Sequence, residues 1–200
     1  MRFIIIVFLV VCSINSLFAQ NNSSDLLNIV QEKYNNISDL SANFSQTANS
    51  GNSASGKFYY KKDKMLRIEF KNLTIITNGK TTWNYNKKEN KVIISTYDDS
   101  DPFALSLNKL IYDYPKNSVV KDVSKNNQKI LQLIPKDGES DFKNITIWVK
   151  DDNLINRVIF EDAASNKSDI TISGYNLNSG LNDSKFSFTA PEGSTVIDLR

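Results

Sequence analysis

Apolar and polar residues alternate with a period of two over most of this chain, as they do in strands that have one buried face. Asn78-Gly79 and the polar segment 86–90 are typical of hairpin turns, so the strands before residue 98 are expected to form an antiparallel meander. Segments of strand length bounded by turn-forming residues are predicted at 41–47, 55–61, 65–70, 73–77, 81–86 and 91–97, and again at 119–123, 130–134, 144–150, 155–161, 168–175 and 185–188.

Two segments have helical spacing instead. Ser23 or Ser24 can cap a helix whose apolar face consists of Leu26, Leu27, Val30 and Tyr34. A second helix is expected to open at Asp101-Pro102, since Asp caps helices and Pro suits their first turn, and to end at Pro115. Its apolar residues are dense enough to pack onto a sheet: Phe103, Leu105, Leu107, Leu110 and Ile111.

The alternation predicts that one side of the sheet is consistently apolar, because polar residues separate the apolar ones in each strand. The apolar series are Phe58 and Tyr60; Leu66, Ile68 and Phe70; Trp83 and Tyr85; and Ile145, Ile147 and Val149. A sheet of ten to eleven strands is on the order of 50 Å wide, whereas one helix covers a strip of about 10 Å. Two short helices cannot cover such a face while it is flat, so we expect the sheet to curl towards a barrel.

A barrel of more than about eight strands tends to leave an interior that its side chains do not fill. The pattern alone does not distinguish such an apolar cavity from a fully packed core. A cavity would suit hydrocarbon, because each methylene removed from water contributes about 0.8 kcal/mol.

Composition places the chain among ordinary globular proteins and favours one domain, since it has 200 residues of which 40% are hydrophobic and 23% charged. The 24 basic and 22 acidic residues leave a formal net charge of +2. This balance gives no electrostatic reason to expect a nucleic-acid partner.

The N-terminus has the pattern of a secretory signal: a basic residue, an apolar run over 3–11 and small residues up to Ala19. We therefore predict a signal peptide at 1–19 and a mature domain at 20–200. The run is too short to span a membrane comfortably. The alternatives are a retained N-terminal anchor and a lipid-modified Cys12, although the three residues before Cys12 lack the small side chains of lipid-processing signals.

Cys12 is the only cysteine of the chain, and histidine is absent from it. A chain cleaved after Ala19 would therefore have no disulfide, no thiol nucleophile and none of the commonest zinc ligands. We expect neither a metal nor a cofactor, and a carrier or binding protein rather than an enzyme.

Four stretches carry a resemblance to a known family, namely Ser-Ala-Asn-Phe-Ser-Gln at 41–46, Gly-Lys-Phe-Tyr-Tyr-Lys-Lys at 56–62, Asn-Gly-Lys-Thr-Thr-Trp-Asn-Tyr at 78–85 and Lys-Phe-Ser-Phe-Thr-Ala-Pro-Glu-Gly-Ser-Thr-Val-Ile-Asp at 185–198. In this order, and with Asp101-Pro102-Phe103 where the lid helices begin, they resemble the LolA family of periplasmic outer-membrane lipoprotein carriers. No single motif is specific, but the ordered combination covers nearly the whole mature chain. The resemblance implies a mainly β fold, in which a single large antiparallel sheet curls into an unclosed half-barrel with short helices as a lid over an apolar cavity.

The resemblance also implies a function without catalysis. A monomeric periplasmic chaperone of this kind receives acylated lipoproteins from an inner-membrane ABC transporter, shields their acyl chains and delivers them to the outer membrane, where an acceptor lipoprotein is a further expected partner. The candidate cavity residues are Phe44, Phe58, Tyr60, Leu66, Ile68, Phe70, Trp83 and Tyr85. The candidate lid residues are Phe103, Leu105 and Leu107.

The sequence departs from the family pattern at one position. Family members often have an Arg-Pro pair after the second strand, and the Arg helps to hold the lid shut, whereas this chain has Lys62-Asp63. A lysine is a single flexible charge rather than a planar fork of five donors, so Lys62 would make a different latch. Arg67 is the alternative candidate for this role.

Three other functions stay open at this point. One is a carrier of another lipid or hydrophobic ligand on the same half-barrel. Another is a glycosidase whose paired carboxylates come from the acidic clusters at 98–101, 151–152 or 161–162, although Asp is also a common turn residue. The third is a protein-binding module that uses exposed sheet edges.

Overall fold

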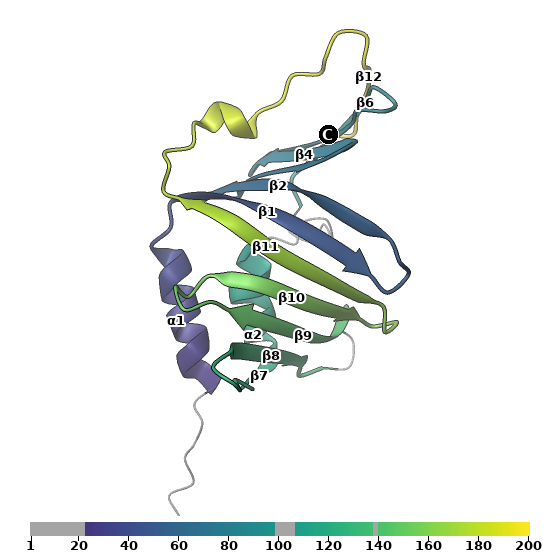
Figure 1. Ribbon diagram of the computed structural model, residues 1–200. Helices are drawn as coiled ribbons and strands as arrows, with labels where there is room; N and C mark the ends of the chain where they lie inside the picture. The colour runs from purple at the N-terminus through teal and green to yellow at the C-terminus, as the bar shows by residue number, and fades with distance from the viewer. Residues whose placement is uncertain (1–22, 99–106, 138–139) are drawn as a thin grey trace, which may run out of the picture.

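The computed structural model describes residues 23–98, 107–137 and 140–200, and within these residues it contains one sheet of twelve strands. The strand order is β12-β6-β5-β4-β3-β2-β1-β11-β10-β9-β8-β7. Neighbouring strands are antiparallel except β12, which runs parallel to β6. The two ends of this order, β12 and β7, do not pair with each other in the described part of the chain, so the sheet is curved but unclosed (Figure 1).

The fold class predicted from the sequence is confirmed, since a single large sheet carries only short helices. The strands are β1 (Asp39–Ala48), β2 (Ser53–Lys61), β3 (Met65–Phe70), β4 (Leu73–Asn78), β5 (Thr81–Asn86), β6 (Lys91–Thr96), β7 (Ser118–Asp122), β8 (Lys129–Pro135), β9 (Phe142–Val149), β10 (Ile155–Asp162), β11 (Lys167–Leu177) and β12 (Thr195–Asp198). The helices are α1 (Ser23–Asn35), the π-helix η1 (Lys109–Asp113), α2 (Tyr114–Lys116) and the 3-10 helix η2 (Asp183–Phe186). None of the helices in the described segments is long and apolar enough to cross a membrane.

The second predicted helix is present where the structure describes it. Residues 107–116 form a continuous helix that contains η1 and α2, whereas the expected opening at Asp101-Pro102 lies outside the described residues. Pro115 does not end the helix, which continues to Lys116. Pro115 cannot donate a backbone hydrogen bond, and the wider π turn just before it accommodates this loss.

Both α1 and the helix 107–116 pack on one side of the sheet, which we call the inner face; the opposite side is the outer face. One core cluster joins the two helices to the strands β8, β9 and β10. Its most completely buried members are Val30, Leu40, Ile111, Leu131, Leu133, Ile145, Ile155 and Val158. This half of the inner face is a packed core.

A pair of tyrosines joins α1 to β10 inside this core. The hydroxyl of Tyr34 accepts a hydrogen bond from the Ile155 backbone nitrogen at 3.2 Å, and the hydroxyl of Tyr175 donates to the Ile155 carbonyl oxygen at 2.7 Å. The ladder between β9 and β10 is irregular here, so the tyrosines satisfy backbone groups that the ladder leaves free. Burial raises the pKa of Tyr34 and raises that of Tyr175 well above its ordinary value, so both hydroxyls stay neutral.

The predicted strand at 185–188 is wrong, because its first half belongs to η2 and the last strand is instead β12. Asn182 caps η2 by accepting a hydrogen bond from the Ser184 backbone nitrogen at 2.9 Å. The residues 178–194 form an extended connection, which we call the strap, that runs along the outside of the sheet from β11 to β12 (Figure 1).

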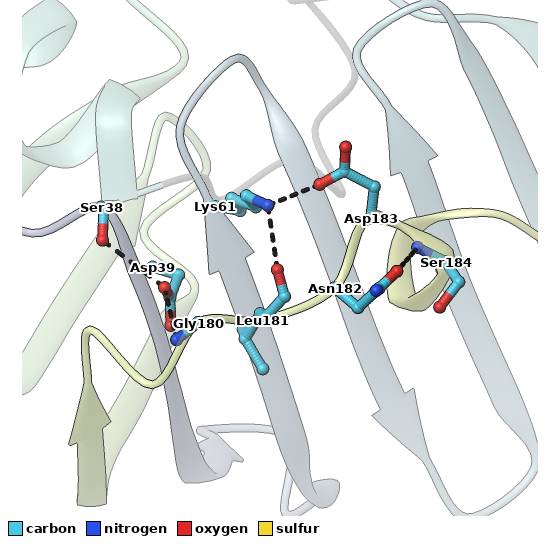
Figure 2. A network of polar contacts seen from close by, with 8 residues as sticks. All are labelled: Ser38, Asp39, Lys61, Gly180, Leu181, Asn182, Asp183 and Ser184. Atoms are coloured by element: carbon cyan, nitrogen blue, oxygen red, sulfur yellow. Dashed lines mark hydrogen bonds and ion pairs between the residues drawn. The ribbon is translucent and has the colours of Figure 1, made fainter.

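Polar contacts fix the start of the strap to β1 and β2 (Figure 2). The buried Asp39 carboxylate accepts hydrogen bonds from the Ser179 nitrogen at 2.9 Å and from the Gly180 nitrogen at 3.0 Å. Lys61 donates to the Leu181 carbonyl at 2.9 Å and forms an ion pair with Asp183. These contacts hold the strap where it leaves the end of β11.

Aromatic contacts anchor the rest of the strap on the outer face. Phe186 is fully buried, and η2 lies over β3 and β4. The ring of Phe188 packs on that of Tyr85 in β5, with 5.2 Å between the centroids. The strap therefore covers the outer face of β3–β5, as the two helices cover the inner face of β7–β10.

Candidate functional site: an apolar surface on the inner face

An apolar surface continues on the inner face beyond the packed core, across β1–β4. Residues that are directly opposite in neighbouring strands project to the same side of a sheet. Phe58 pairs with Ile68, which pairs with Ile75, and Phe58 itself belongs to the helix-covered core cluster. This chain of pairs defines the inner apolar surface as Phe44, Phe58, Tyr60, Leu66, Ile68, Phe70 and Ile75.

Five of these seven side chains are only half-buried, whereas Phe58 and Ile75 are 9% and 7% exposed. The inner face is therefore less completely covered over β1–β4 than over β8–β10. Six of the predicted cavity residues lie together here: Phe44, Phe58, Tyr60, Leu66, Ile68 and Phe70.

A glycine allows three of the aromatic rings to meet. Gly56 lies between Phe44 of β1 and Phe70 of β3 in the ladder, and the two rings contact each other edge to face at 5.2 Å. Phe44 also lies 6.5 Å from Phe58. A Cβ at residue 56 would approach the Glu69 carbonyl oxygen to 2.1 Å and the Phe44 ring to 3.0 Å, so the position accepts no side chain without movement.

Trp83 and Tyr85 do not belong to this surface, and their assignment to the same cavity is corrected here. Trp83 pairs with Ile76 and Tyr85 with Thr74, whereas the inner face of β4 carries Ile75. Both aromatic residues of β5 therefore project to the outer face. The physical reason is the length of the β4–β5 turn, which exchanges odd and even positions between the two strands.

The helix 107–116 lies against the packed part of the inner face. Its buried side chains are Leu107, Leu110 and Ile111, which join the core cluster. Tyr60 of the inner apolar surface donates a long hydrogen bond of 3.5 Å to Asn108. Leu107 is therefore placed as a lid residue would be, while the candidates Phe103 and Leu105 lie outside the described residues.

Polar contacts from α1 also hold this helix. Gln31 donates a hydrogen bond of 2.9 Å to the Ile111 carbonyl oxygen. In a regular helix this carbonyl would accept from the backbone nitrogen of residue 115, but Pro115 has no N–H to donate. Tyr112 donates to Asn35 at 2.6 Å. These contacts would have to break if the helix moved away from α1.

Neither predicted latch residue contacts the described part of the lid at 107–116, so the latch role of Lys62 and Arg67 stays a prediction. Lys62 donates to the Asn35 carbonyl at 2.9 Å and thereby satisfies the C-terminal end of α1. Arg67 is on the outer face, where it donates to Glu69 at 2.6 Å and to the Lys185 carbonyl of the strap at 3.4 Å. The described polar contacts to the lid come instead from Gln31, Asn35 and Tyr60.

The tyrosine of the inner apolar surface and those of the helix 107–116 are uncharged at neutral pH. Burial is the main cause that raises the pKa of Tyr60, Tyr112 and Tyr114 above the ordinary value for tyrosine. Their hydroxyls can therefore donate hydrogen bonds without bringing negative charge to the apolar surface.

Two carboxylates of the acidic clusters that the enzyme hypothesis requires, Asp152 and Asp162, have roles in turns. Asp152 accepts hydrogen bonds from Lys150 and from the Leu154 nitrogen, and Asp162 accepts from the Asn166 nitrogen at 2.8 Å. Asp99 and Asp101 lie outside the described residues. Over residues 23–98, 107–137 and 140–200 the structure contains no group of three acidic, histidine or cysteine side chains able to hold a metal ion.

This architecture defines a class of protein: an open, mainly antiparallel half-barrel that has helices and an apolar surface on its inner side. The chain belongs to the family of the outer membrane lipoprotein carrier protein LolA, whose family profile matches residues 35–189.

Relatives from several bacteria carry the corresponding name. The chain is 29% identical to the outer-membrane lipoprotein carrier protein of Francisella philomiragia, over 99% of this chain and 98% of that protein. It is 25% identical to the protein of the same name from Cronobacter sakazakii, over 96% of this chain and 97% of that protein. An uncharacterized conserved protein from Thermus thermophilus has the same fold, with a TM-score of 0.59 and 14% identity over 88% of this chain and 98% of that one.

Proposed function

We propose that this protein is a lipoprotein carrier that holds the acyl chains of its cargo on the inner apolar surface while the cargo crosses the periplasm. Membership of the LolA family supports carriage of lipoproteins. The structural observation that carries the assignment of the site is the half-buried group of aromatic and branched side chains over β1–β3.

The energy available on such a surface is sufficient for carriage. Burial of about ten methylenes contributes roughly 8 kcal/mol before the costs of association, at about 0.8 kcal/mol for each methylene. The acyl-contact residues in this proposal are Phe44, Phe58, Tyr60, Leu66, Ile68 and Phe70, with Leu107 on the lid side. Trp83 and Tyr85 are left out because their strand register directs them to the outer face.

The proposal includes partners and a compartment. Export by the signal peptide at 1–19 would deliver the protein to the periplasm. An inner-membrane ABC transporter would hand over the acylated lipoprotein, and an acceptor at the outer membrane would receive it. A monomeric carrier that binds its cargo through the acyl chains needs neither a cofactor nor a catalytic group.

The first test is purification from the native envelope, followed by mass spectrometry of the bound species. Acylated lipoproteins are the expected result. Free glycolipid or another free lipid in their place would assign the same surface to a different cargo and would overturn the proposal.

A pair of matched variants tests the assignment of the surface. Ile68→Glu introduces a charge on the inner apolar surface, where a carboxylate against hydrocarbon costs several kcal/mol, so binding of a diacylated peptide should be lost. Met65→Glu is the control, because Met65 is in the same strand and projects to the outer face. Equal binding by both variants would contradict the assignment.

A further inference from the structure

The inner face changes from apolar to polar between β4 and β5. Ile75 of β4 pairs with Asn84 of β5, and Thr77 pairs with Thr82, which in turn pairs with Ser95 of β6. Unbroken register through these strands keeps all five side chains on the inner face. The inner apolar surface therefore borders on Thr82 and Asn84 of β5, and Ser95 of β6 lies next to Thr82, with Ile93 opposite Asn84. We call Thr82, Asn84 and Ser95 the polar margin.

The polar margin has hydrogen-bonding capacity that the described part of the chain does not use. Thr77 accepts a hydrogen bond from the Gly79 nitrogen at 3.1 Å. By contrast, no hydrogen bond joins the side chains of Thr82, Asn84 or Ser95 to any residue in the described segments. Thr82 is 6% exposed, and the other two are half-buried. Hydrocarbon laid over these groups would leave them unsatisfied, which costs free energy for each group.

The spacing of the polar margin fits a compact head group that has more than one acceptor. Thr82 and Ser95 are directly opposite in neighbouring strands, so their Cβ atoms are about 5 Å apart. Asn84 is two residues further along β5, at about 7 Å. From this margin the inner apolar surface extends back over β4, β3, β2 and β1, so long hydrocarbon chains have room in that direction.

We propose that the polar margin binds the ester carbonyl oxygens through which the acyl chains of a lipoprotein are attached to its first residue, while the chains themselves lie over the inner apolar surface. This inference rests on the proposed carrier function and adds a site for the head group. The hydroxyls of Thr82 and Ser95 and the carboxamide of Asn84 are donors, and ester carbonyls are acceptors without charge, so the two sets are complementary. The cargo is thereby oriented, with its peptide leaving the protein at β5 and β6.

The experiment compares two probes that have the same hydrocarbon. One is a diacylglyceryl-cysteinyl peptide with ester links, and the other is the dialkyl ether analogue, which lacks both ester carbonyls. Titrations use the mature protein, the variants Thr82→Val, Asn84→Leu and Ser95→Ala, and the control Thr171→Val, which changes an exposed threonine on the outer face. The unfolding midpoint of each variant is measured alongside.

The expected result is a Kd for the ester peptide that rises about threefold to tenfold for each lost hydrogen bond, with the Kd for the ether analogue unchanged. Thr82→Ser keeps the hydroxyl and should keep the affinity of the original protein for the ester peptide. The control should change neither Kd.

Equal weakening of both probes would overturn the inference, because it would mean that the polar margin acts through packing. An unchanged Kd for the ester peptide in all three variants would overturn it as well. Failure of the unaltered protein to bind either probe would be a different outcome, since it would remove the carrier function itself.

Discussion

Phe186 gives the most direct test of how the strap holds the sheet. Its side chain is fully buried on the outer face of β3 and β4, although the chain around it has no regular ladder with these strands. Truncation of a buried phenylalanine to alanine costs about 3–5 kcal/mol, through the lost transfer energy and the cavity that remains. This is a large share of the roughly 5–15 kcal/mol that is typical of a folded domain.

The variant Phe186→Ala should therefore lower the free energy of unfolding by about 3–5 kcal/mol. With a urea dependence of about 2–3 kcal/mol per molar, the unfolding midpoint should fall by more than about 1 M. Tryptophan fluorescence can follow the transition, because Trp83 lies on the outer face that the strap covers. The control Thr189→Ala changes an exposed strap residue and should stay within about 0.5 kcal/mol of the original protein.

A loss below about 1 kcal/mol for Phe186→Ala would refute the conclusion that the strap is a structural part of the domain. A changed slope with urea would have another meaning, because it would show that the strap detaches before the sheet unfolds. Limited proteolysis within the strap distinguishes these results, since early cleavage is expected only if the strap detaches.

Two further predictions concern a glycine and a buried carboxylate. Gly56→Ala should destabilise the protein by about 1–3 kcal/mol, because the new Cβ would lie 2.1 Å from the Glu69 carbonyl oxygen. Thermal unfolding measures this loss, and an unchanged melting temperature would contradict the close packing of β2 against β3. Burial opposes the charge of Asp39, but hydrogen bonds from Ser179 and Gly180 outweigh it and lower the pKa. The ionised Asp39 therefore stabilises the folded protein fully above the pKa of about 3.9 that an aspartate has in the unfolded chain. This stabilisation is lost as the pH falls through the lower pKa of Asp39 in the folded protein. Urea midpoints measured between pH 7 and pH 3 should fall less steeply for Asp39→Asn than for the original protein, and parallel curves would contradict the assignment.

Most strands of the sheet could be predicted from their period of two, because turns that are recognisable from their own residues separate them. The hairpin at Gly79 is an example, since the Asn78 side chain accepts hydrogen bonds from the nitrogens of Lys80 and Thr81. The strap could not be predicted in this way. Its segment 185–188 alternates as a strand does, but the strap's partners are Lys61, Asp39 and other residues far away in the sequence.

The candidate residues of β2 and β3 share one face of the sheet, whereas those of β5 project to the other face. The sequence contains a signal that separates them, namely the number of residues in each turn. A two-residue turn pairs even positions with odd ones, so Leu66 pairs with Thr77 and Thr77 pairs with Thr82. Followed through two such turns, the inner face carries Thr82 and Asn84 and excludes Trp83.

The latch was predicted from the residue that replaces the family arginine, and the described contact of Lys62 is with α1. A lysine close to the end of a helix finds free carbonyl groups there, and Lys62 binds one of them on Asn35. Contacts such as Gln31 to Ile111 depend on where two helices meet, which strand and helix periodicity do not determine.

The strap has a mechanical consequence for the entry of a ligand. It is attached to β1 and β2 at one end and to β6 at the other, where Thr195 to Asp198 pair with the edge strand. A change in the curvature of β1–β6 would disturb these attachments and the buried position of Phe186. The strands on this side therefore act as a wall of fixed curvature, and the space over them can widen at low cost only by displacement of the helices.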